Sequence, residues 1–363
     1  MSLFEPIERR DHEQVIFCSD RESGLRAIIA IHNTTLGPAL GGARMWPYEN
    51  DHAALEDALR LSEGMTYKAA ISGLDLGGGK AVIIGDPRTM KSETLFRSFG
   101  RFIEGLAGRY ITAEDVGTTV RDMEWVRMGT KYVTGIHSRN GGGDPSPLTA
   151  YGVYHGMKAA AAKAFGSSSL EGRSVALQGA GNVAGHLVGH LVAEGADVTI
   201  TDIFDEKVKE LMGKHPGIKG VAPNEIYDVA CDIFSPAALG GSINDATIDR
   251  LRTSIVAGPA NNQLDDPLRH ATALRDRDIL YIPDYAINAG GLINVAIELE
   301  GYSQERALVR TEEIYHVIER ILELSDREKI LTVEASNRIA EERIKSVGRI
   351  RRRYAGRSEM EKW

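Results

Sequence analysis

The feature that most constrains the fold is a glycine-rich turn at residues 179–184, which reads GAGNVA. A strand-like run, VALQ, comes directly before this turn, and a helix-like run, NVAGHLVGHLVAE, comes directly after it. In that context the pattern is typical of a dinucleotide-binding βαβ unit, because its glycines permit a tight turn and its backbone N–H groups can hold a pyrophosphate. The predicted pyrophosphate contacts are Gly179, Ala180, Gly181, Asn182, Val183 and Ala184.

An acidic residue ends the next strand-like run, DVTITD, at Asp202. It follows the first glycine of the turn by roughly 20 residues, as the dinucleotide fingerprint requires. A carboxylate there can accept hydrogen bonds from the adenosine ribose hydroxyls, and it repels a 2′-phosphate. The sequence therefore predicts NAD rather than NADP as the cofactor.

The second half of the chain continues this alternation of helix and strand. Further strand-like runs cover 231–236, 254–259 and 279–284. Such alternation predicts a parallel sheet with right-handed crossovers, which is a doubly wound Rossmann fold. The end of the chain is predicted to be helical, over 291–301, 303–325 and 328–355.

The first half predicts a second α/β region. Helices are expected from Asp51, the predicted N-cap, and over 91–106. The predicted strands are 14–20, 25–33, 81–86 and 109–117. A run rich in glycine, proline and serine, HSRNGGGDPSP at 137–147, is typical of a linker, so we expect two α/β domains, at 1–145 and 146–327.

Two lysines stand out in the stretch GMTYKAAISGLDLGGGK. Lys68 falls near the end of a predicted helix, and Lys80 closes three glycines that are predicted to form a loop. A lysine beside a second cation has a lowered pKa, which suits a general base. Asp115, in the polar tip of ITAEDVG, would complete a proton-transfer pair. The plainer interpretation of the two lysines is that they are solvated in a surface turn. The plainer interpretation of Asp115 is that it is a turn residue or a helix N-cap.

Composition argues against several other classes of protein. The net charge of −8 disfavours a nucleic-acid surface over the whole molecule. No stretch approaches the ~20 apolar residues of a membrane span, and the N-terminus lacks the apolar region of a signal peptide. Cys18 and Cys231 have neither metal-ligand nor disulfide-scaffold spacing, so we expect a reduced, cytoplasmic protein without a membrane or nucleic-acid partner.

Two smaller patterns have plain interpretations. His186 and His190 have the spacing of zinc ligands, but HLVGH lacks the glutamate and third ligand of a metalloprotease. We interpret them as ordinary helix-face histidines and predict no metal site. The basic run RIRRRYAGR at 349–357 would contact RNA or an acidic partner, or form a solvated helix end, which is the interpretation that we favour.

Several motifs together resemble one known family of proteins. They are LGPALGGARMW, EDALRLSEGMTYK, GLDLGGGK, GRYITAEDVGTT, DPSPLTAYGVYHGMKAA, GAGNVA, ANNQL and PDYAINAGGLINVA. Through these motifs, across roughly residues 10–350, the chain resembles the amino acid dehydrogenases of the glutamate/leucine/phenylalanine/valine superfamily, and within it the leucine dehydrogenase family most closely. The resemblance implies a substrate-binding and catalytic domain at 1–145, a Rossmann NAD domain at 146–327, a cleft between them, and a C-terminal helix at ~328–363 that packs back on the first domain.

The resemblance also implies a reaction. A branched-chain aliphatic L-amino acid (leucine, valine or isoleucine) would react reversibly with NAD and water to give the 2-oxo acid, ammonium and NADH. A phenylalanine- or valine-preferring member of the same family is an alternative, and a non-catalytic NADH-binding regulator is a remote one. Members of the family are homo-oligomers, often octamers, and we expect a homo-oligomer here.

Residue roles follow from the same resemblance. Lys68 would bind the substrate α-carboxylate, Lys80 would be the catalytic lysine that activates water, and Asp115 would shuttle protons to and from the nitrogen. Asn261 and Asn262 would contact the nicotinamide and the substrate main chain. The residues expected near the cofactor amide are Thr149 and Asn288.

The predicted side-chain pocket favours an apolar substrate, because Leu40 stands where glutamate-specific members place a lysine that pairs the side-chain carboxylate. The implied pocket wall comprises Leu40, Gly41, Ala113, Leu292 and Val295. The chain departs from the usual family pattern at Ala43, Pro259 and Leu292. One methylene is worth only about 1–3 kcal/mol of discrimination, so the order among the branched-chain substrates stays open.

Overall fold

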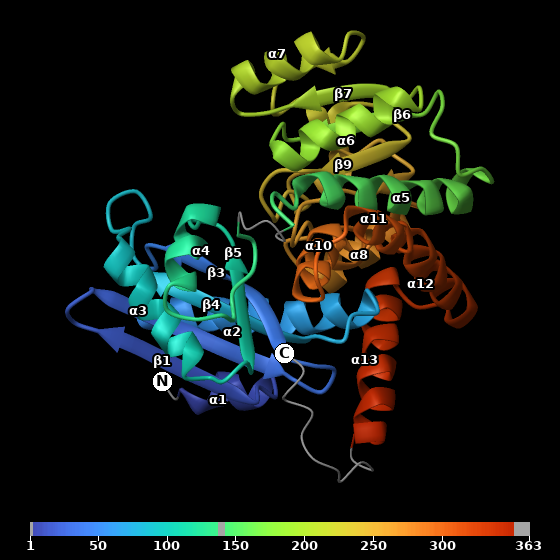
Figure 1. Cartoon of the computed structure of the whole chain (residues 1–363). Coiled ribbons are helices and arrows are strands. Elements are labelled where there is room, and N and C mark those ends of the chain that lie inside the picture. The colour runs from blue at the N-terminus through green and yellow to red at the C-terminus, as the bar shows by residue number, and fades with distance from the viewer. Residues whose placement is uncertain (1–2, 137–141, 352–363) are drawn as a thin grey trace. The chain divides into compact units, whose positions relative to one another are not determined.

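The computed structural model describes residues 3–136 and 142–351, and the chain divides into two compact units (Figure 1). The first unit comprises Met1–Gly143, Val295–Tyr302 and Ala340–Trp363, and the second comprises Asp144–Asn294 and Ser303–Ile339. Part of the predicted linker, at 137–141, and the predicted helix end and basic tail beyond residue 351 lie outside the described residues.

A five-stranded mixed sheet, ordered β1-β2-β4-β3-β5, forms the centre of the first unit. β2 pairs antiparallel with both β1 and β4, whereas β3 lies between β4 and β5 and is parallel to both. β3 therefore separates the strand that carries Lys80 from the strand that leads to Asp115. The strands are β1 (Gln14–Asp20), β2 (Leu25–Asn33), β3 (Ala39–Trp46), β4 (Gly77–Ile84) and β5 (Tyr110–Glu114).

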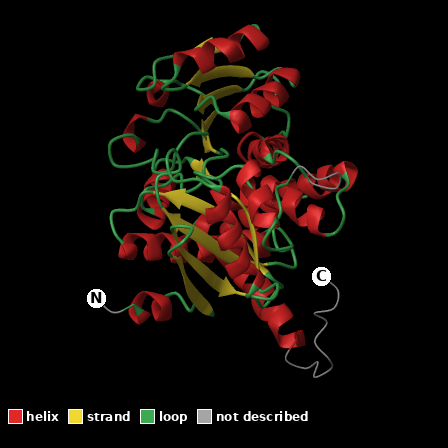
Figure 2. Cartoon of the chain, turned by 60° about the vertical axis from the view of Figure 1, so that its left-hand side comes forward, coloured by secondary structure: helices red, strands yellow, loops and turns green. Residues whose placement is uncertain are grey.

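Helices cover both faces of this sheet (Figure 2). α2 (Asp51–Ile71) packs on one face, and α3 (Glu93–Glu104) with α4 (Val120–Arg127) packs on the other. Side chains alternate between the two faces along a strand, so Ile28 belongs to the apolar core beneath α2 and its neighbour Ile29 to the core beneath α3.

The N-terminus of α2 is capped by Asn50 and not by Asp51 as predicted. The Asn50 side chain accepts a hydrogen bond from the backbone N–H of Ala53, and its backbone is extended (φ −158°). Both residue types cap helices well, so the sequence did not separate them.

The three glycines before Lys80 lie inside β4, and the predicted loop is wrong. A Cβ on Gly78 would stand 2.1 Å from Oγ1 and 2.2 Å from the backbone nitrogen of Thr66 in α2. A Cβ on Gly79 would stand 2.7 Å from the ring of Tyr110. Glycine is therefore required here because neighbouring elements approach the strand closely.

Two histidines fix α2 in this position. His12 Nε2 lies 2.8 Å from Ser62 Oγ, and His32 Nδ1 lies 2.7 Å from Thr66 Oγ1. Burial lowers the pKa of His12 to about 4 and also lowers the pKa of His32. Both rings are therefore neutral near pH 7 and can share hydrogen bonds with the two hydroxyl groups.

The second unit contains a six-stranded sheet in which every pairing is parallel, ordered β11-β10-β9-β6-β7-β8. Counted from β6 as the first strand, this is the 3-2-1-4-5-6 order of the Rossmann fold. The predicted doubly wound fold is confirmed. The strands are β6 (Ser174–Gln178), β7 (Asp197–Thr201), β8 (Lys219–Gly220), β9 (Ile233–Pro236), β10 (Ile255–Val256) and β11 (Leu280–Tyr281).

Helices connect these strands, and two further helices contribute residues to both units. The shared helices are α10 (Gly290–Leu299) and α13 (Thr332–Arg351). His190, one of the predicted helix-face histidines, stacks on the ring of Tyr154 with 5.3 Å between ring centroids. The other helices of this unit are α5 (Ser146–Phe165), α6 (Asn182–Ala193), α7 (Asp205–Lys214), α8 (Pro267–Asp276), α9 (Asp284–Ile287), α11 (Gln304–Glu312) and α12 (Ile314–Glu328).

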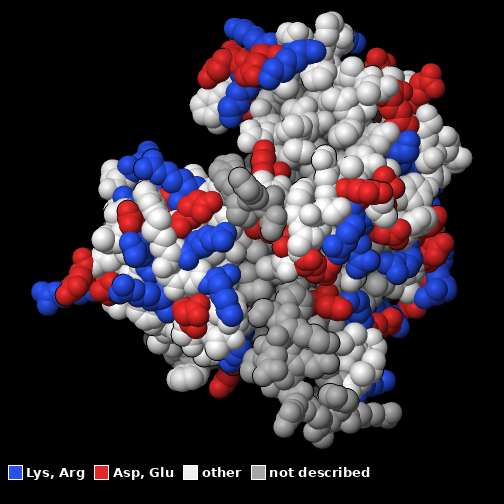
Figure 3. Space-filling view, in the orientation of Figure 1, with Lys and Arg blue, Asp and Glu red and all other residues white. Residues whose placement is uncertain are grey.

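The first unit also contains a short N-terminal helix, α1 (Phe4–Arg9). Within the described ranges, no helix combines the length and apolar character that a membrane crossing requires. On the face drawn in Figure 3, acidic and basic side chains of the described residues are interspersed.

Gly78→Ala is expected to lower the thermal unfolding temperature, because the new Cβ overlaps the backbone of α2. Overpacking of this kind costs typically about 1–3 kcal/mol, and sometimes more. Gly64→Ala is the matched control, since a Cβ on this exposed residue of α2 meets nothing within 4 Å. Alanine is favoured there over glycine by about 1 kcal/mol. Scanning calorimetry that finds equal unfolding temperatures for Gly78→Ala and the wild type would contradict this account.

Candidate active site

The predicted site residues of the first unit gather on one face of its sheet. The register pairs Leu40 of β3 with Gly78 of β4 and with Ile111 of β5. Gly78 faces α2, and every second residue along a strand lies on the same face. The positions that share this face are Leu40, Gly42, Arg44, Lys80, Ala113 and, just beyond the end of β5, Asp115.

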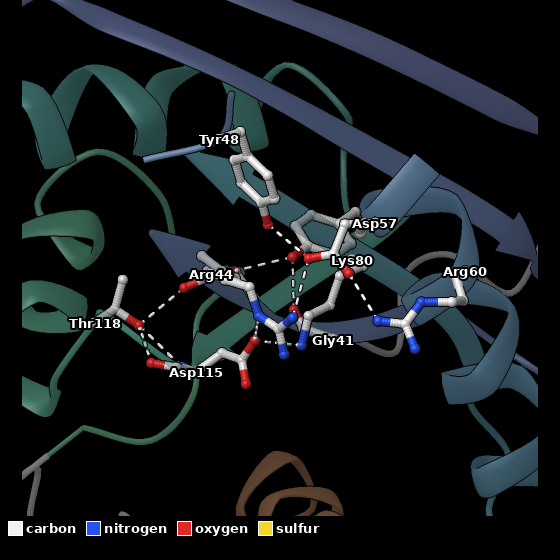
Figure 4. A network of polar contacts seen from close by, with 11 residues as sticks. Gly41, Arg44, Tyr48, Asp57, Arg60, Lys80, Asp115 and Thr118 are labelled. Carbon is white, nitrogen blue, oxygen red and sulfur yellow. Dashed lines mark hydrogen bonds and ion pairs between the residues drawn. The ribbon is translucent and has the colours of Figure 1, made fainter. Parts of the chain in front are cut away.

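Lys80 and Asp115 form an ion pair, with 2.8 Å between Lys80 Nζ and Asp115 Oδ2 (Figure 4). The lysine side chain is 7% exposed. The two residues reach each other across β3, where the intervening position is Gly42. A Cβ on Gly42 would stand 2.8 Å from the Cβ of Asp115 and 2.4 Å from the carbonyl oxygen of Glu114. The structure thus brings together the lysine and the acid that the sequence analysis paired, and their chemical roles stay predictions.

Sequence reasoning missed a polar network that continues from this pair. Arg44 Nε donates to Asp115 Oδ2 at 3.1 Å, and Arg44 Nη1 donates to Asp57 Oδ2 at 3.0 Å. The Tyr48 hydroxyl donates to the same oxygen of Asp57 at 2.6 Å, and Arg60 donates to the other at 2.9 Å. Arg44 lies in the motif LGGARMW, but only the strand register shows that it shares a face of the sheet with Lys80 and Asp115.

Charge stabilises the ionised form of Asp115. Burial alone raises the pKa of Asp115, but the charges of Lys80 and Arg44 outweigh burial and hold the pKa below its ordinary value. Burial likewise opposes the charge on Arg44, yet Asp115 and Asp57 together raise the pKa of Arg44. Asp115 and Arg44 are therefore both charged at neutral pH.

A tight turn fixes the backbone of Asp115. Its N–H donates to Thr118 Oγ1 at 2.9 Å, and that hydroxyl donates to the carbonyl of Ala43 at 2.9 Å. Gly117 has a φ of +82°, and a Cβ there would stand 2.0 Å from the carbonyl oxygen of Met45. Thr119, and not Asp115, is the N-cap of the following helix, so the N-cap interpretation of Asp115 is wrong.

Lys68 lies half-buried in the last turns of α2, two residues beyond Thr66. Its carbonyl accepts a hydrogen bond from Ser72 Oγ at 2.7 Å, which closes the end of the helix. α2 approaches β4 closely where Thr66 meets Gly78. Lys68 follows Thr66 by two residues, and Lys80 likewise follows Gly78 by two. Binding of a substrate carboxylate by Lys68 stays a prediction.

In the second unit the fingerprint turn has the shape that a pyrophosphate needs. Gly179 has a φ of +124°, and a Cβ there would stand 2.8 Å from the carbonyl of Ala237, so only glycine fits. Gly181 is the N-cap of α6, where no side chain caps the helix and a Cβ would meet nothing within 4 Å. The first backbone N–H groups of α6 are therefore open to an anion, and these residues fit the predicted cofactor.

Asp202 lies directly beside this turn. Its Oδ2 accepts the backbone N–H of Ala180 at 2.7 Å, and its Oδ1 accepts the N–H of Phe204 at 3.0 Å. The carboxylate therefore supports the turn in addition to standing where the fingerprint expects a ribose-binding acid.

The residues expected near the nicotinamide also meet in the second unit. Asn288 Nδ2 donates to Asn261 Oδ1 at 2.6 Å and to the carbonyl of Pro259 at 3.0 Å. Asn288 Oδ1 is buried and has no hydrogen-bond partner among the residues that the structure describes, so it suits a ligand N–H. Asn262 has a φ of +51°, and its carbonyl accepts the N–H of Gly241 at 2.7 Å.

Of the remaining predicted residues, Thr149, Leu292 and Val295 lie near or on α10, whereas Gly41 lies in β3. A Cβ on Gly291, in the first turn of α10, would stand 2.8 Å from Thr149 Oγ1. Leu292 and Val295 are one helical turn apart and so share a face of α10. Gly41 belongs to the opposite face of the first sheet, and its carbonyl accepts the Tyr110 hydroxyl at 2.6 Å. Contact of these residues with a substrate or cofactor stays a prediction.

A Rossmann sheet with this fingerprint, in a chain that also holds a partly buried lysine–carboxylate pair, is typical of nicotinamide-dinucleotide-dependent dehydrogenases. Comparison with known protein families supports this class. A family described as "Glu/Leu/Phe/Val dehydrogenase, dimerisation domain" matches residues 12–132, and one described as "Glutamate/Leucine/Phenylalanine/Valine dehydrogenase" matches residues 199–350.

Individual relatives extend over almost the whole chain. Leucine dehydrogenase of Bacillus cereus is 58% identical over 355 residues, covering 98% of this chain and 96% of the relative. Phenylalanine dehydrogenase of Lysinibacillus sphaericus is 49% identical over 358 residues, covering 97% and 93%. The crystal structure of L-tryptophan dehydrogenase from Nostoc punctiforme is similar with a TM-score of 0.83 and 45% identity, covering 95% and 99%. The chain belongs to the Glu/Leu/Phe/Val dehydrogenase family and is an amino acid dehydrogenase, which confirms the predicted resemblance.

Gly42→Ala is expected to lower kcat for amino acid oxidation roughly 100-fold, because displacing a catalytic group by about 1 Å can cost that much. The new Cβ would force Asp115 or the end of β5 to move. Gly64→Ala serves again as the control. Steady-state kinetics and circular dichroism would be compared, and a folded Gly42→Ala variant with wild-type kcat would show that the space at Gly42 is not needed.

Proposed function

We propose that this chain catalyses the reversible oxidative deamination of a branched-chain aliphatic L-amino acid, using NAD and water to produce the 2-oxo acid, ammonium and NADH. The observation that carries the proposal is the partly buried ion pair of Lys80 and Asp115, at 2.8 Å, in a member of this dehydrogenase family. Further support comes from several relatives named leucine dehydrogenase, which are 56–59% identical to the chain.

The proposed chemistry divides among three side chains. Lys68 holds the substrate α-carboxylate by charge pairing, which orients the Cα. Lys80 Nζ accepts a proton from the water that attacks the imino carbon, acting as a general base. Asp115 carries protons to and from the departing nitrogen, and its contact with Lys80 lets a proton pass between the two. The nicotinamide, when bound, supplies the hydride acceptor.

An aliphatic substrate side chain fits the composition of the site face. Leu40 is 2% exposed and Ala113 is 8% exposed, and both lie on the same face as Lys80. An apolar wall leaves the side-chain carboxylate of glutamate without a partner, which carries a large desolvation cost. Relatives named leucine dehydrogenase are also more similar to the chain than the phenylalanine dehydrogenase at 49% identity.

The first experiment measures NADH formation with leucine, valine, isoleucine, phenylalanine and glutamate, in the wild type and in Lys80→Ala. Turnover of the branched-chain substrates is expected, and Lys80→Ala is expected to lower kcat by about 10²–10⁴-fold, as loss of a general base does. Lys345→Ala, at a lysine with a 68% exposed side chain, is the matched control. No turnover of any amino acid by the wild type, or substantial turnover by a folded Lys80→Ala variant, would contradict the proposal.

NAD rather than NADP is the proposed cofactor, because the carboxylate of Asp202 lies beside the fingerprint turn and would repel a 2′-phosphate. Asp202→Ser removes the charge while keeping an oxygen that can accept the Ala180 N–H. This variant is expected to reduce the NAD-to-NADP ratio of kcat/KM at least about tenfold, since one unbalanced charge pair is worth more than 1.4 kcal/mol at short range.

Asp205→Ser is the control for this substitution, because Asp205 is exposed in the first turn of α7. Kinetics with both cofactors would be measured for each variant. A ratio that stays at the wild-type value in Asp202→Ser would show that another group selects the cofactor.

We also propose that the protein acts in the cytoplasm as a homo-oligomer. The description of the first matching family as a dimerisation domain supports the assembly.

A further inference from the structure

The guanidinium group of Arg44 joins two carboxylates that come from different elements. Its Nε donates to Asp115 Oδ2, beyond the end of β5, and its Nη1 donates to Asp57 Oδ2, on α2. We propose that Arg44 is a positioning residue, which rests on the proposed function: it holds the Asp115 carboxylate against Lys80 without itself touching the substrate.

The far end of Arg44 is firmly anchored. The Asp57 carboxylate accepts hydrogen bonds from Arg44, from the Tyr48 hydroxyl at 2.6 Å and from Arg60 at 2.9 Å (Figure 4). The side chains of Arg44 and Asp57 are only 22% and 15% exposed. Three donors on one partly buried carboxylate restrict its rotamers, so Asp57 ties the orientation of Arg44 to α2.

Asp115 is in this way held from two sides. Lys80 on β4 and Arg44 on β3 both reach the same oxygen, Oδ2, at 2.8 and 3.1 Å. Figure 4 shows the other carboxylate oxygen pointing away from the two cations. With Lys80 alone the carboxylate would keep one charged partner and more rotational freedom. With Arg44 in addition, one orientation of the carboxylate is strongly favoured.

An arginine suits this place better than a lysine. Its planar guanidinium presents N–H groups in fixed directions and can bridge two carboxylates, whereas an ammonium group is a point charge on a flexible stem. The partly buried groups are also balanced in charge, with Lys80 and Arg44 opposite Asp115 and Asp57. Arg60 is 47% exposed and meets Asp57 from the solvent side.

The same contacts predict a pH signature. Asp115 faces Lys80 from β4 and Arg44 from β3, and behind Arg44 lie Asp57 and Arg60 of α2 together with Tyr48. Burial disfavours the ionised form of Asp115, and Arg44 is one of the two charges that outweigh it. Loss of Arg44 therefore raises the pKa of Asp115. Because activity needs the ionised form, it would then be lost at a higher pH as the solution is acidified.

The test compares four variants of the full-length protein. Arg44→Met is expected to lower kcat roughly 10- to 100-fold and to move the acid limb of the kcat/KM–pH profile upward by about one pH unit or more. Arg44→Lys is expected to restore the position of the acid limb but only part of kcat, because lysine supplies the charge without the fixed N–H directions of a planar guanidinium. Asp57→Asn, which acts on Arg44 from its far end, is expected to lower kcat while Asp115 keeps both of its cationic neighbours.

Arg60→Met is the matched control. It removes a donor from Asp57 but leaves the contacts of Asp115 intact, so the acid limb is expected to stay in place. Unfolding temperatures of all four variants would show that each is folded.

Two readouts do not depend on turnover. A crystal structure of Arg44→Met is expected to show Asp115 Oδ2 displaced from Lys80 Nζ. A carbon-13 titration of labelled aspartate, with the Asp115 signal assigned by Asp115→Asn, is expected to show a raised pKa in Arg44→Met and an unchanged one in Arg60→Met. If both the ion pair and the Asp115 titration match the wild type, the proposal for Arg44 is overturned. If the wild type oxidises no amino acid, the proposed function fails, while these two readouts still decide the role of Arg44.

Discussion

The site face of the first sheet depends on how closely α2 approaches β4. At Gly78 the strand has no side chain, and the backbone of Thr66 occupies the space that a Cβ would need. Hydrogen bonds between two neutral histidines and the hydroxyl groups of Ser62 and Thr66 hold the helix at this distance. Since α2 also carries Asp57, the approach sets the place of the carboxylate that orients Arg44, and through Arg44 it sets the orientation of Asp115.

Sequence alone predicted more of the second unit than of the first. The reason is that the defining pattern of the second unit is local in the chain, whereas the site of the first unit depends on contacts between residues far apart in the chain. The fingerprint at residues 179–184 is a local strand–turn–helix pattern, so sequence alone predicted both the Rossmann fold and the acid at Asp202. In the first unit the sequence analysis paired Lys80 with Asp115, and the structure brings the two into contact. Arg44 and Asp57 were not paired, because their contact depends on strand register and on the packing of a helix, which a single sequence does not reveal. The glycines before Lys80 favour a loop by local preference, and close tertiary packing overrides that preference.

In each unit, side chains at the predicted sites also hold neighbouring residues in place. Asp202 supports the fingerprint turn through the N–H of Ala180, and Asn288 joins Asn261 to the backbone at Pro259. Thr118 ties the turn that carries Asp115 to the neighbouring strand at Ala43. Such supporting contacts fix the geometry of functional groups before a ligand arrives, which lowers the cost of ordering them later. Pro259, where the chain departs from the usual family pattern, takes part through its carbonyl oxygen, which any residue at that position would supply.

The arrangement of the site face has a consequence for how the chain can change in length. Leu40, Gly42 and Arg44 reach the same face because they occupy alternate positions of β3, and Lys80 does so through its register with them. Inserting or deleting one residue within β3 or β4 would turn every following side chain to the opposite face. After such a change ahead of Gly42 in β3, the arginine would point into the apolar core beneath α3, and the space at Gly42 would be lost. Length variation among functional relatives should therefore fall in the connections between these strands, and an alignment that places a gap inside either strand is misregistered.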